Sequence, residues 1–534
     1  MTIQMSSQER ESDEYDAELS VNLTGFGRFN IKVLILCGLI YMNTGFSISS
    51  VGLVMPSAAC DFNLTTVDKG RISAVPMLGM FFGGYLWGCF ADLRGRKKGL
   101  SVALFSHFLF EIISSVVPNY WGYLCLKFLS GFSISGQGVI LFSYLGEFQP
   151  TKMREKILCW LEMAWSLGLI ALPLTGWAII PLNISFVSDN FFFQSWNLFV
   201  AICSLPSLFI GLWLCSFPET PKYLMQAGED AKWAQVLERM YKENTGKSYA
   251  EYLEKVSKSG VDSLNERLLN AKSLAVKTEK LSKTNESMVI SRIYKQSIAL
   301  FKPPYLARTS IVCTTMFCLG SSYYALMLWF PELFKRFGDF EVKYPGESTS
   351  VCRISKYSTE TNETVAIVNE CPTHIQTEVY IHTLILGAAC VPLSLILPLF
   401  INKLGYKFYL IVSSFIASAV TVGLFFAVSS TQNLILSCIF EAFSSVGMSI
   451  VLCMAVDLYP THLRAMATAL CGAFGRVGAL IGNSLFGYLI DNYCITLILI
   501  IAAQLLACSV LGIFIPLEKK NKNVDTSTEK ISTP

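Results

Sequence analysis

The feature that most constrains this chain is a series of apolar runs, each about 20 residues long, the length that crosses the apolar core of a bilayer as a helix. Only 15% of the residues are charged, whereas an average soluble domain has roughly 25%. A soluble multidomain enzyme would need more polar surface, so we predict an all-α integral membrane protein. The predicted spans are 31–56, 70–91, 99–117, 122–147, 157–181, 194–216, 306–331, 379–401, 408–428, 434–457, 465–490 and 494–516.

Lysine and arginine gather in the short loops after the second, fourth, eighth and tenth spans. The short loops on the other side carry Lys69 alone. Because such residues favour the cytoplasmic side, we predict that both termini are cytoplasmic. The predicted divisions are a cytoplasmic tail (1–30), a first six-helix half (31–216), a cytoplasmic central loop (217–305), a second six-helix half (306–516) that includes a luminal or extracellular loop (335–378), and a cytoplasmic tail (517–534).

The segments that are predicted to face away from the cytoplasm carry candidate modification sites. Asn183 and Asn362 begin N-glycosylation sequons there. Cys352 and Cys371 are the only two cysteines that share a polar segment, so this is the one pair that we consider for a disulfide. Most of the 17 cysteines lie in apolar runs, where Cys behaves as a small hydrophobe.

Motifs in the first half of the chain recur in the second half, in the same order and at one constant offset. Repetition of this kind indicates an internal duplication. Two parallel halves that face each other across a midplane cavity form a transporter architecture. The matching pairs are Asp92 and Asn402, Gly95 and Gly405, Lys97 and Lys407, Glu147 and Asp457, Arg154 and Arg464, and Gly168 and Gly478.

The loop after the second span resembles the G-x-x-x-D-R-x-G-R-K loop of the major facilitator superfamily. Glycine permits a tight turn at position 95, and a carboxylate at position 92 can pair with an arginine. An anchor that holds the loop on the cytoplasmic side would explain the charges but not their spacing. The matching residues are Gly88, Asp92, Gly95, Arg96 and Lys97.

Two further stretches resemble loops of related transporters. Residues 144–154 are similar to the loop after helix 4 in the organic cation and anion transporters, and residues 218–222 to the P-E-S-P-R motif of that group and of sugar porters. The resemblance implies charged latches that open and close during transport, and a static ion network is the alternative. The latch candidates outside the first loop are Glu147, Arg154, Glu219, Asp457 and Arg464.

The end of the seventh span, residues 323–332, resembles the synaptic vesicle glycoprotein 2 family. The chain is thereby identified as a member of the major facilitator superfamily, with twelve helices in two six-helix halves. The resemblance implies a plasma membrane or a secretory or synaptic vesicle membrane. The sequence departs from that family in the first span, which has no carboxylate, and in the tenth, where Met448 and Leu452 occupy the region of a tryptophan.

Ionisable side chains at membrane depth are costly and are treated as functional candidates. Arg476 lies near the middle of the eleventh span, and an arginine in this helix faces the cavity in anion-selective relatives. The resemblance therefore favours an anion or zwitterion as substrate, with a structural ion pair as the alternative. Glu162 is the first candidate for its partner or for a proton carrier, and Glu441 and Glu111 are weaker candidates.

Aromatic and amide side chains complete the predicted substrate cavity. Aromatic rings within a span can stack on a ligand or simply pack between helices, and both readings stay open. Amides and imidazoles can supply hydrogen bonds. The candidates are Asn43, Gln137, Trp165, Tyr323, Tyr324 and His382.

Two functions remain open from the sequence. The first is a secondary transporter of a small polar organic solute, with proton or ion coupling as an option. The second is a non-transporting receptor or trafficking protein that binds a cytoplasmic partner through its acidic N-terminal tail. The sequence shows no catalytic constellation, Walker loop, metal cluster or basic stripe for nucleic acid, so we expect no enzyme and no cofactor.

Overall fold

The computed structural model describes residues 7–182, 184–188, 191–258, 261, 264–269, 298–347, 349–356, 375–459 and 461–515. Within these ranges, the side chains at 7–14, 155, 159, 162, 397–403, 456–457, 461–462 and 464–465 lie outside the description.

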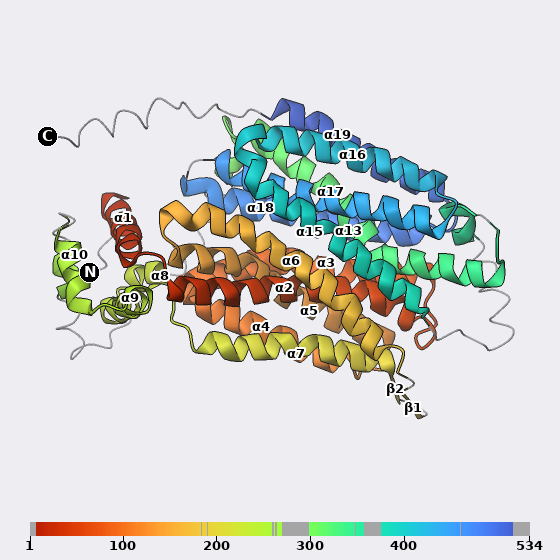
Figure 1. Cartoon of the computed structure of the whole chain (residues 1–534), viewed down its shortest axis with the longest axis horizontal. Coiled ribbons are helices and arrows are strands. Elements are labelled where there is room, and N and C mark those ends of the chain that lie inside the picture. Colours follow the sequence, from red (N-terminus) through yellow and green to blue (C-terminus); the bar gives the residue numbers. More distant parts are fainter. Residues whose placement is uncertain are drawn as a thin grey trace.

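A long helix occupies each of the twelve predicted spans, and the helices form one bundle (Figure 1). By length and composition, eleven of them can cross a membrane by themselves. The exception is α4, which carries Arg96, Lys97, Lys98 and Glu111 within 19 residues. The first half contains α2 (Arg28–Ser57), α3 (Thr66–Arg94), α4 (Arg96–Ser114), α5 (Tyr120–Phe148), α6 (Thr151–Ile179) and α7 (Ser195–Cys215). The second contains α13 (Leu306–Lys343), α15 (Thr377–Leu404), α16 (Tyr406–Phe426), α17 (Ser430–Asp457), α18 (Thr461–Leu489) and α19 (Cys494–Phe514).

The duplication seen in the sequence is also a duplication of helix packing. Gly168 on α6 lies so close to α2 that an added Cβ would be 2.9 Å from the backbone nitrogen of Phe46. Gly478 on α18 lies equally close to α13, where its Cβ would be 3.0 Å from the nitrogen of Ser321. The fifth helix of each half therefore crosses the first helix of that half at a glycine, because only glycine lets the two backbones approach so closely.

Four shorter helices pack together at the end of the bundle that is predicted to be cytoplasmic (Figure 1). They are α1 (Ser7–Thr24), α8 (Pro221–Gln226), α9 (Asp230–Thr245) and α10 (Tyr249–Ser257). Ala17 and Val21 of α1 are buried against this group, and the Tyr252 hydroxyl donates to the Ser20 carbonyl over 3.0 Å. Residues 17–21 of the predicted tail are thus part of a packed helix and not a free surface.

The opposite end of the bundle departs from the sequence prediction in two places. Helix α13 continues through Lys343, although we predicted a loop from residue 335. A small antiparallel hairpin of β1 (Ser185–Ser188) and β2 (Phe191–Gln194) precedes α7. The sequons at Asn183 and Asn362 lie outside the described residues.

The predicted pairing of Cys352 with Cys371 is wrong. Cys352 forms a disulfide with Cys494 at the start of α19, with 5.4 Å between the two Cα atoms. The two cysteines are 142 residues apart in sequence, and the prediction compared only cysteines within one loop. Cys371 itself lies outside the described residues, and Cys60 is also disulfide-bonded.

Candidate functional site

Arg476 lies on α18 at the contact between the two halves. A Cβ added to Gly138 on α5, in the other half, would be 4.0 Å from its guanidinium. One guanidinium nitrogen donates to the Gly472 carbonyl of its own helix over 3.1 Å, and its buried Nε has no hydrogen-bond partner among the described groups. Arg476 therefore has unused donor capacity at the interface, and the predicted ion pair is not seen with any described carboxylate.

Two tyrosines, one from each half, lie near this arginine. Tyr41 of α2 and Tyr324 of α13 are close enough to interact with it electrostatically. The Tyr41 ring contacts Trp165 of α6 and Phe142 of α5, with ring centroids 5.5 and 5.3 Å apart. Sequence reasoning missed Tyr41 and Phe142, although both are aromatic residues within a span, as Trp165 is.

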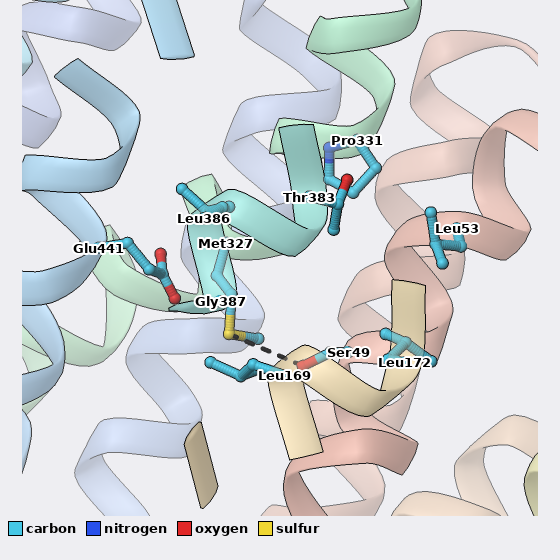
Figure 2. Close-up of a pocket in the computed structure, with 10 residues that line it drawn as sticks. All are labelled: Ser49, Leu53, Leu169, Leu172, Met327, Pro331, Thr383, Leu386, Gly387 and Glu441. Atoms are coloured by element: carbon cyan, nitrogen blue, oxygen red, sulfur yellow. Dashed lines mark hydrogen bonds between the residues drawn. The ribbon is translucent and has the colours of Figure 1, made fainter. Parts of the chain in front are cut away.

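A second feature of the interface is a cavity of about 20 Å³, which is room for about one water molecule. Figure 2 shows the carboxylate of Glu441, on α17, directed toward Met327 beside this cavity. The Glu441 side chain is buried, and neither of its oxygens has a hydrogen-bond partner among the described groups. The other lining residues are Ser49, Leu53, Leu169, Leu172, Pro331, Thr383, Leu386 and Gly387.

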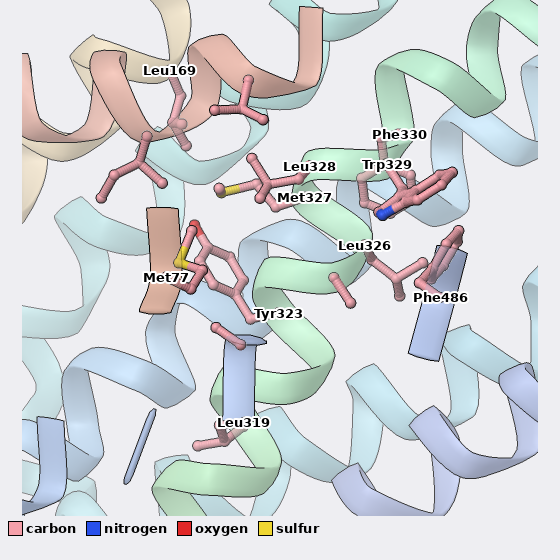
Figure 3. Packing of buried hydrophobic residues seen from close by; sticks show 14 of the residues in the cluster. Met77, Leu169, Leu319, Tyr323, Leu326, Met327, Leu328, Trp329, Phe330 and Phe486 are labelled. Atoms are coloured by element: carbon pink, nitrogen blue, oxygen red, sulfur yellow. The ribbon is translucent and has the colours of Figure 1, made fainter. Parts of the chain in front are cut away.

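Tyr323 lies between the surroundings of Arg476 and the cavity beside Glu441. It precedes Tyr324 on α13, their ring centroids are 5.1 Å apart, and its hydroxyl interacts electrostatically with Glu441. Figure 3 shows its ring among buried apolar side chains of the same helix and of facing helices, including Met77 and Leu169. The structure thus brings Trp165, Tyr323, Tyr324, Glu441 and Arg476 together.

Asn43 and Gln137, which were also predicted to line the substrate cavity, form hydrogen bonds inside the first half. The Asn43 amide nitrogen donates to Gln137 over 3.0 Å and to the Ser207 hydroxyl over 2.9 Å, and all three side chains are buried. The same hydroxyl is 2.6 Å from Nδ1 of His107. This hydrogen-bonded group joins α2, α4, α5 and α7, so Asn43 and Gln137 make contacts within their own half. The Asn43 Oδ1 and the Gln137 Nε2 have no hydrogen-bond partner among the described groups.

Two further candidates lie away from Arg476. Glu111 accepts from Lys127 over 2.7 Å and also bonds Ser130, so this buried carboxylate is ion-paired within the first half. His382, near the start of α15, packs against Phe334 with ring centroids 5.4 Å apart.

The latch motif of the first half forms a compact ion network at the predicted cytoplasmic end. Arg96 is buried, lies 3.2 Å from Glu147 and 3.4 Å from Asp92, and stacks over the Tyr223 ring. The backbone N–H of Lys97 donates to Glu219 over 2.8 Å.

Gly95 supplies the turn that brings the network together. Its φ of 102° lies in the region that favours glycine, and a Cβ there would collide with the Glu219 carboxylate. Gly88, by contrast, sits within α3 with open space beside it.

Arg154 is held by a different partner. Its guanidinium donates to Glu18 of α1 over 2.9 Å, so the N-terminal helix engages the first turn of α6. The side chains of Glu162, Asp457 and Arg464 lie outside the described ones, and their predicted roles stay predictions.

Sequence reasoning missed an ion cluster that joins the two halves at the opposite end. We call it the inter-half ion cluster: Lys69, Glu332, Arg336 and Asp491. Glu332 accepts from Lys69 over 2.6 Å and from Arg336 over 3.1 Å, and Arg336 also bonds Asp491 over 2.9 Å. Lys69 stands at the start of α3, and the other three belong to the second half. The isolated position of Lys69 among the short loops of that side was the one available signal.

Two family models match the chain. The model for sugar (and other) transporters matches residues 6–292, and the model for the major facilitator superfamily matches residues 373–534. Together they cover parts of both six-helix halves.

Among curated proteins, synaptic vesicle glycoprotein 2A of Bos taurus is 30% identical over 347 residues, which cover 64% of this chain and 47% of that protein. The chain thus spans about half the length of the 2A proteins that it matches. Synaptic vesicle glycoprotein 2B of Homo sapiens is 24% identical over 598 aligned positions, covering 97% of this chain and 87% of that one.

Among solved structures, the xylose transporter XylE from E. coli in a partially occluded inward open conformation aligns with a TM-score of 0.61 at 13% identity, covering 91% of this chain and 96% of that one. The same transporter bound to 6-bromo-6-deoxy-D-glucose aligns with a TM-score of 0.62 at 15% identity, covering 91% and 94%. At these identities the likeness shows the fold, which is that of the major facilitator superfamily.

Proposed function

The chain belongs to the sugar (and other) transporter family of the major facilitator superfamily, and from this premise we propose a secondary transporter of a small polar organic solute, with an anion or zwitterion favoured. The family and fold are those of membrane transporters and not of enzymes. The proposed mechanism is alternating access, in which the two halves rock about a site between them. The proposal includes a plasma membrane or vesicle membrane as location, with both termini cytoplasmic.

The observation that carries the proposal is the position of Arg476. A guanidinium at the interface whose Nε lacks a partner among the described groups is costly unless a ligand completes it. Its planar fork of donors suits a carboxylate or another oxyanion. A neutral sugar would leave the positive charge uncompensated, so the anion or zwitterion is the better match.

The aromatic residues around Arg476 suit the organic part of such a solute. Tyr41 and Trp165 come from the first half and Tyr324 from the second. A ligand that contacts rings from both halves would be bound differently as the halves rock. That difference in contacts is what lets a solute drive a conformational change.

The inter-half ion cluster supports alternating access. It joins the halves at the end opposite the predicted cytoplasmic side, and both Lys69 and Glu332 are nearly buried in it. A transporter must break such a closure to open on that side. We therefore propose that this cluster is the outer gate and that the structure is closed outward.

For coupling, we propose Glu441 as the group that takes up and releases a proton. It is buried at the interface, its oxygens have no described partner, and a water-sized cavity adjoins it. The titratable groups that face it are Tyr323 of α13, Cys390 of α15 and Cys438 of its own helix, with no cation among them. One solved neighbour is named a D-xylose–proton symporter, which supports proton coupling as a proposal.

The test is uptake by the full chain reconstituted in proteoliposomes, with organic anions, zwitterions, cations and sugars offered at two internal pH values. We expect an anion or zwitterion to accumulate. Arg476→Ala should abolish uptake, Arg476→Lys should restore part of it, and Glu441→Gln should remove the response to a pH gradient while leaving exchange intact. Uptake that is unchanged in Arg476→Ala, or confined to sugars, would refute the proposed substrate class.

The structure removes one argument for the alternative function, a non-transporting receptor or trafficking protein. It relied on the acidic N-terminal tail as a free binding surface. Residues 17–21 instead pack within the chain, and Glu18 is paired with Arg154. No described feature favours this alternative over transport.

A further inference from the structure

A large charged groove lies at the predicted cytoplasmic end, outside the transport path. It has a volume of about 980 Å³ and runs between the first turn of α2 and the C-terminal part of α9. The proposed transport mechanism makes no use of it. Its charged lining residues are Arg28, Lys32, Glu238, Arg239, Lys242 and Glu243.

The lining has more cations than carboxylates. Glu243 is shared by Lys32 and Arg239, whose nitrogens lie 2.8 and 2.9 Å from its oxygens. Burial by itself would raise the pKa of Glu243, but the hydrogen bonds from these two cations outweigh it and lower the pKa below 4.5. Glu243 is therefore ionised at neutral pH. The lining holds four cations, Arg28, Lys32, Arg239 and Lys242, and two carboxylates, Glu238 and Glu243, so the groove keeps an excess of positive charge.

The groove continues into surfaces that face lipid. On α2, Arg28 and Lys32 are followed at helical spacing by Ile31, Ile35 and Leu39, whose side chains are 45%, 51% and 37% exposed. Exposed apolar residues at this spacing on a membrane-spanning helix lie against acyl chains. Arg28 lies about one turn before Ile31, and Lys32 lies about one turn before Ile35, on the side nearer the predicted cytoplasm. The two basic residues are then at the level of the lipid headgroups.

The C-terminal end of α7 also lies beside the groove. Arg239 donates to the Ser216 carbonyl at the end of α7 over 3.1 Å and stacks over the Phe29 ring of α2. The last turns of α7 expose Phe209, Leu212 and Trp213. The groove thus lies where the lipid-facing sides of two helices reach the predicted cytoplasmic surface.

We propose that this groove binds the headgroup of an anionic phospholipid of the cytoplasmic leaflet, with an acyl chain along Ile31, Ile35 and Leu39. The volume suits a bulky, multiply charged headgroup such as a phosphorylated inositol better than a single phosphate. Each basic residue near an anionic headgroup contributes to such binding. A soluble anion would use the same cations but not the apolar stripe. The proposal holds whether or not the chain transports a solute.

The test titrates the full-length protein in detergent with phosphatidylinositol 4,5-bisphosphate, phosphatidylserine or phosphatidylcholine and counts bound lipids by native mass spectrometry. We expect saturable binding of the phosphoinositide, weaker binding of phosphatidylserine and none of phosphatidylcholine. Arg28→Gln with Lys242→Gln should weaken the phosphoinositide by about thirtyfold. Lys152→Gln with Lys156→Gln, a matched loss of two exposed cytoplasmic cations, should leave it unchanged.

A variant that is expected to bind the lipid more tightly serves as a control, because damage to the fold would weaken binding. Glu243→Gln releases Lys32 and Arg239 toward the ligand and should tighten phosphoinositide binding by about fivefold. Equal losses in the two double variants, or weaker binding in Glu243→Gln, would overturn the proposal and leave only general attraction to positive charge. If soluble inositol trisphosphate bound as tightly as the lipid, the site would be one for free anions and the lipid proposal would fail.

Discussion

The loop between α3 and α4 and its counterpart between α15 and α16 have the same backbone turn but different charges. Gly95 and Gly405 have φ values of 102° and 79°, and each begins the next helix. Lys97 donates to the Cys215 carbonyl at the end of α7, and Lys407 donates to the Ile515 carbonyl at the end of α19. Both halves therefore tie their third helix to their last helix in one way.

The charged part of the motif is specific to the first half. Asp92 and Arg96 are matched by Asn402 and Tyr406 in the second. The turn and the lysine are thus what the duplicated fold requires. The ion network around Arg96 is an addition to it, and it is where we expect the two halves to differ in stability and in function.

The variant with the largest expected effect tests the ion network around Arg96. Arg96→Gln would leave Glu147, which is nearly buried, without its cation, and losing one partner of a buried pair costs about 3 kcal/mol. We expect a clear fall in the thermal unfolding midpoint of the purified protein. Lys98→Gln, which removes an exposed charge from the same turn of α4, should change this midpoint little. In a double-mutant cycle, Glu147→Gln should cost much less once Arg96 is gone; additive losses would mean that the network contributes no coupling.

The second prediction compares the two glycines directly. Alanine at either position would adopt a backbone conformation that only glycine reaches easily, at a cost of about 1–3 kcal/mol. Gly405→Ala should show this cost alone, because open space surrounds the position. Gly95→Ala should lose more, since its Cβ would displace Glu219. Equal unfolding midpoints for the two variants would show that Glu219 moves aside freely.

The smallest effect concerns pH. Burial raises the pKa of Glu219 above 4.5, although backbone hydrogen bonds and the charge of Arg96 oppose it. A carboxyl with a raised pKa stabilises the fold at low pH, and this contribution is lost as the pH rises through the raised value. The thermal unfolding midpoint of Glu219→Gln minus that of the wild type should therefore increase as the pH rises from about 4 to about 7. Glu229→Gln, at a half-exposed carboxylate, is the control. A difference that shrinks with rising pH would contradict the assignment.

Parts of the candidate site followed from the sequence and parts did not. Arg476 and Glu441 could be named because a charge within an apolar run is conspicuous. Asn43 and Gln137 were also named, yet they bond each other within the first half. Their role depends on how α2 and α5 are rotated, and apolar periodicity does not specify that angle when a helix is buried on several sides.

The sequence by itself determined the positions of the twelve long helices, the two halves and the glycine turns, because these depend on run length, repeated order and local backbone freedom. Only the tertiary structure decided the disulfide of Cys352 with Cys494, the pairing of Glu18 with Arg154 and the inter-half ion cluster. Each of these joins residues that are far apart in the chain. Their meeting depends on helix register and on how the halves pack, and close packing of side chains across the whole bundle sets both.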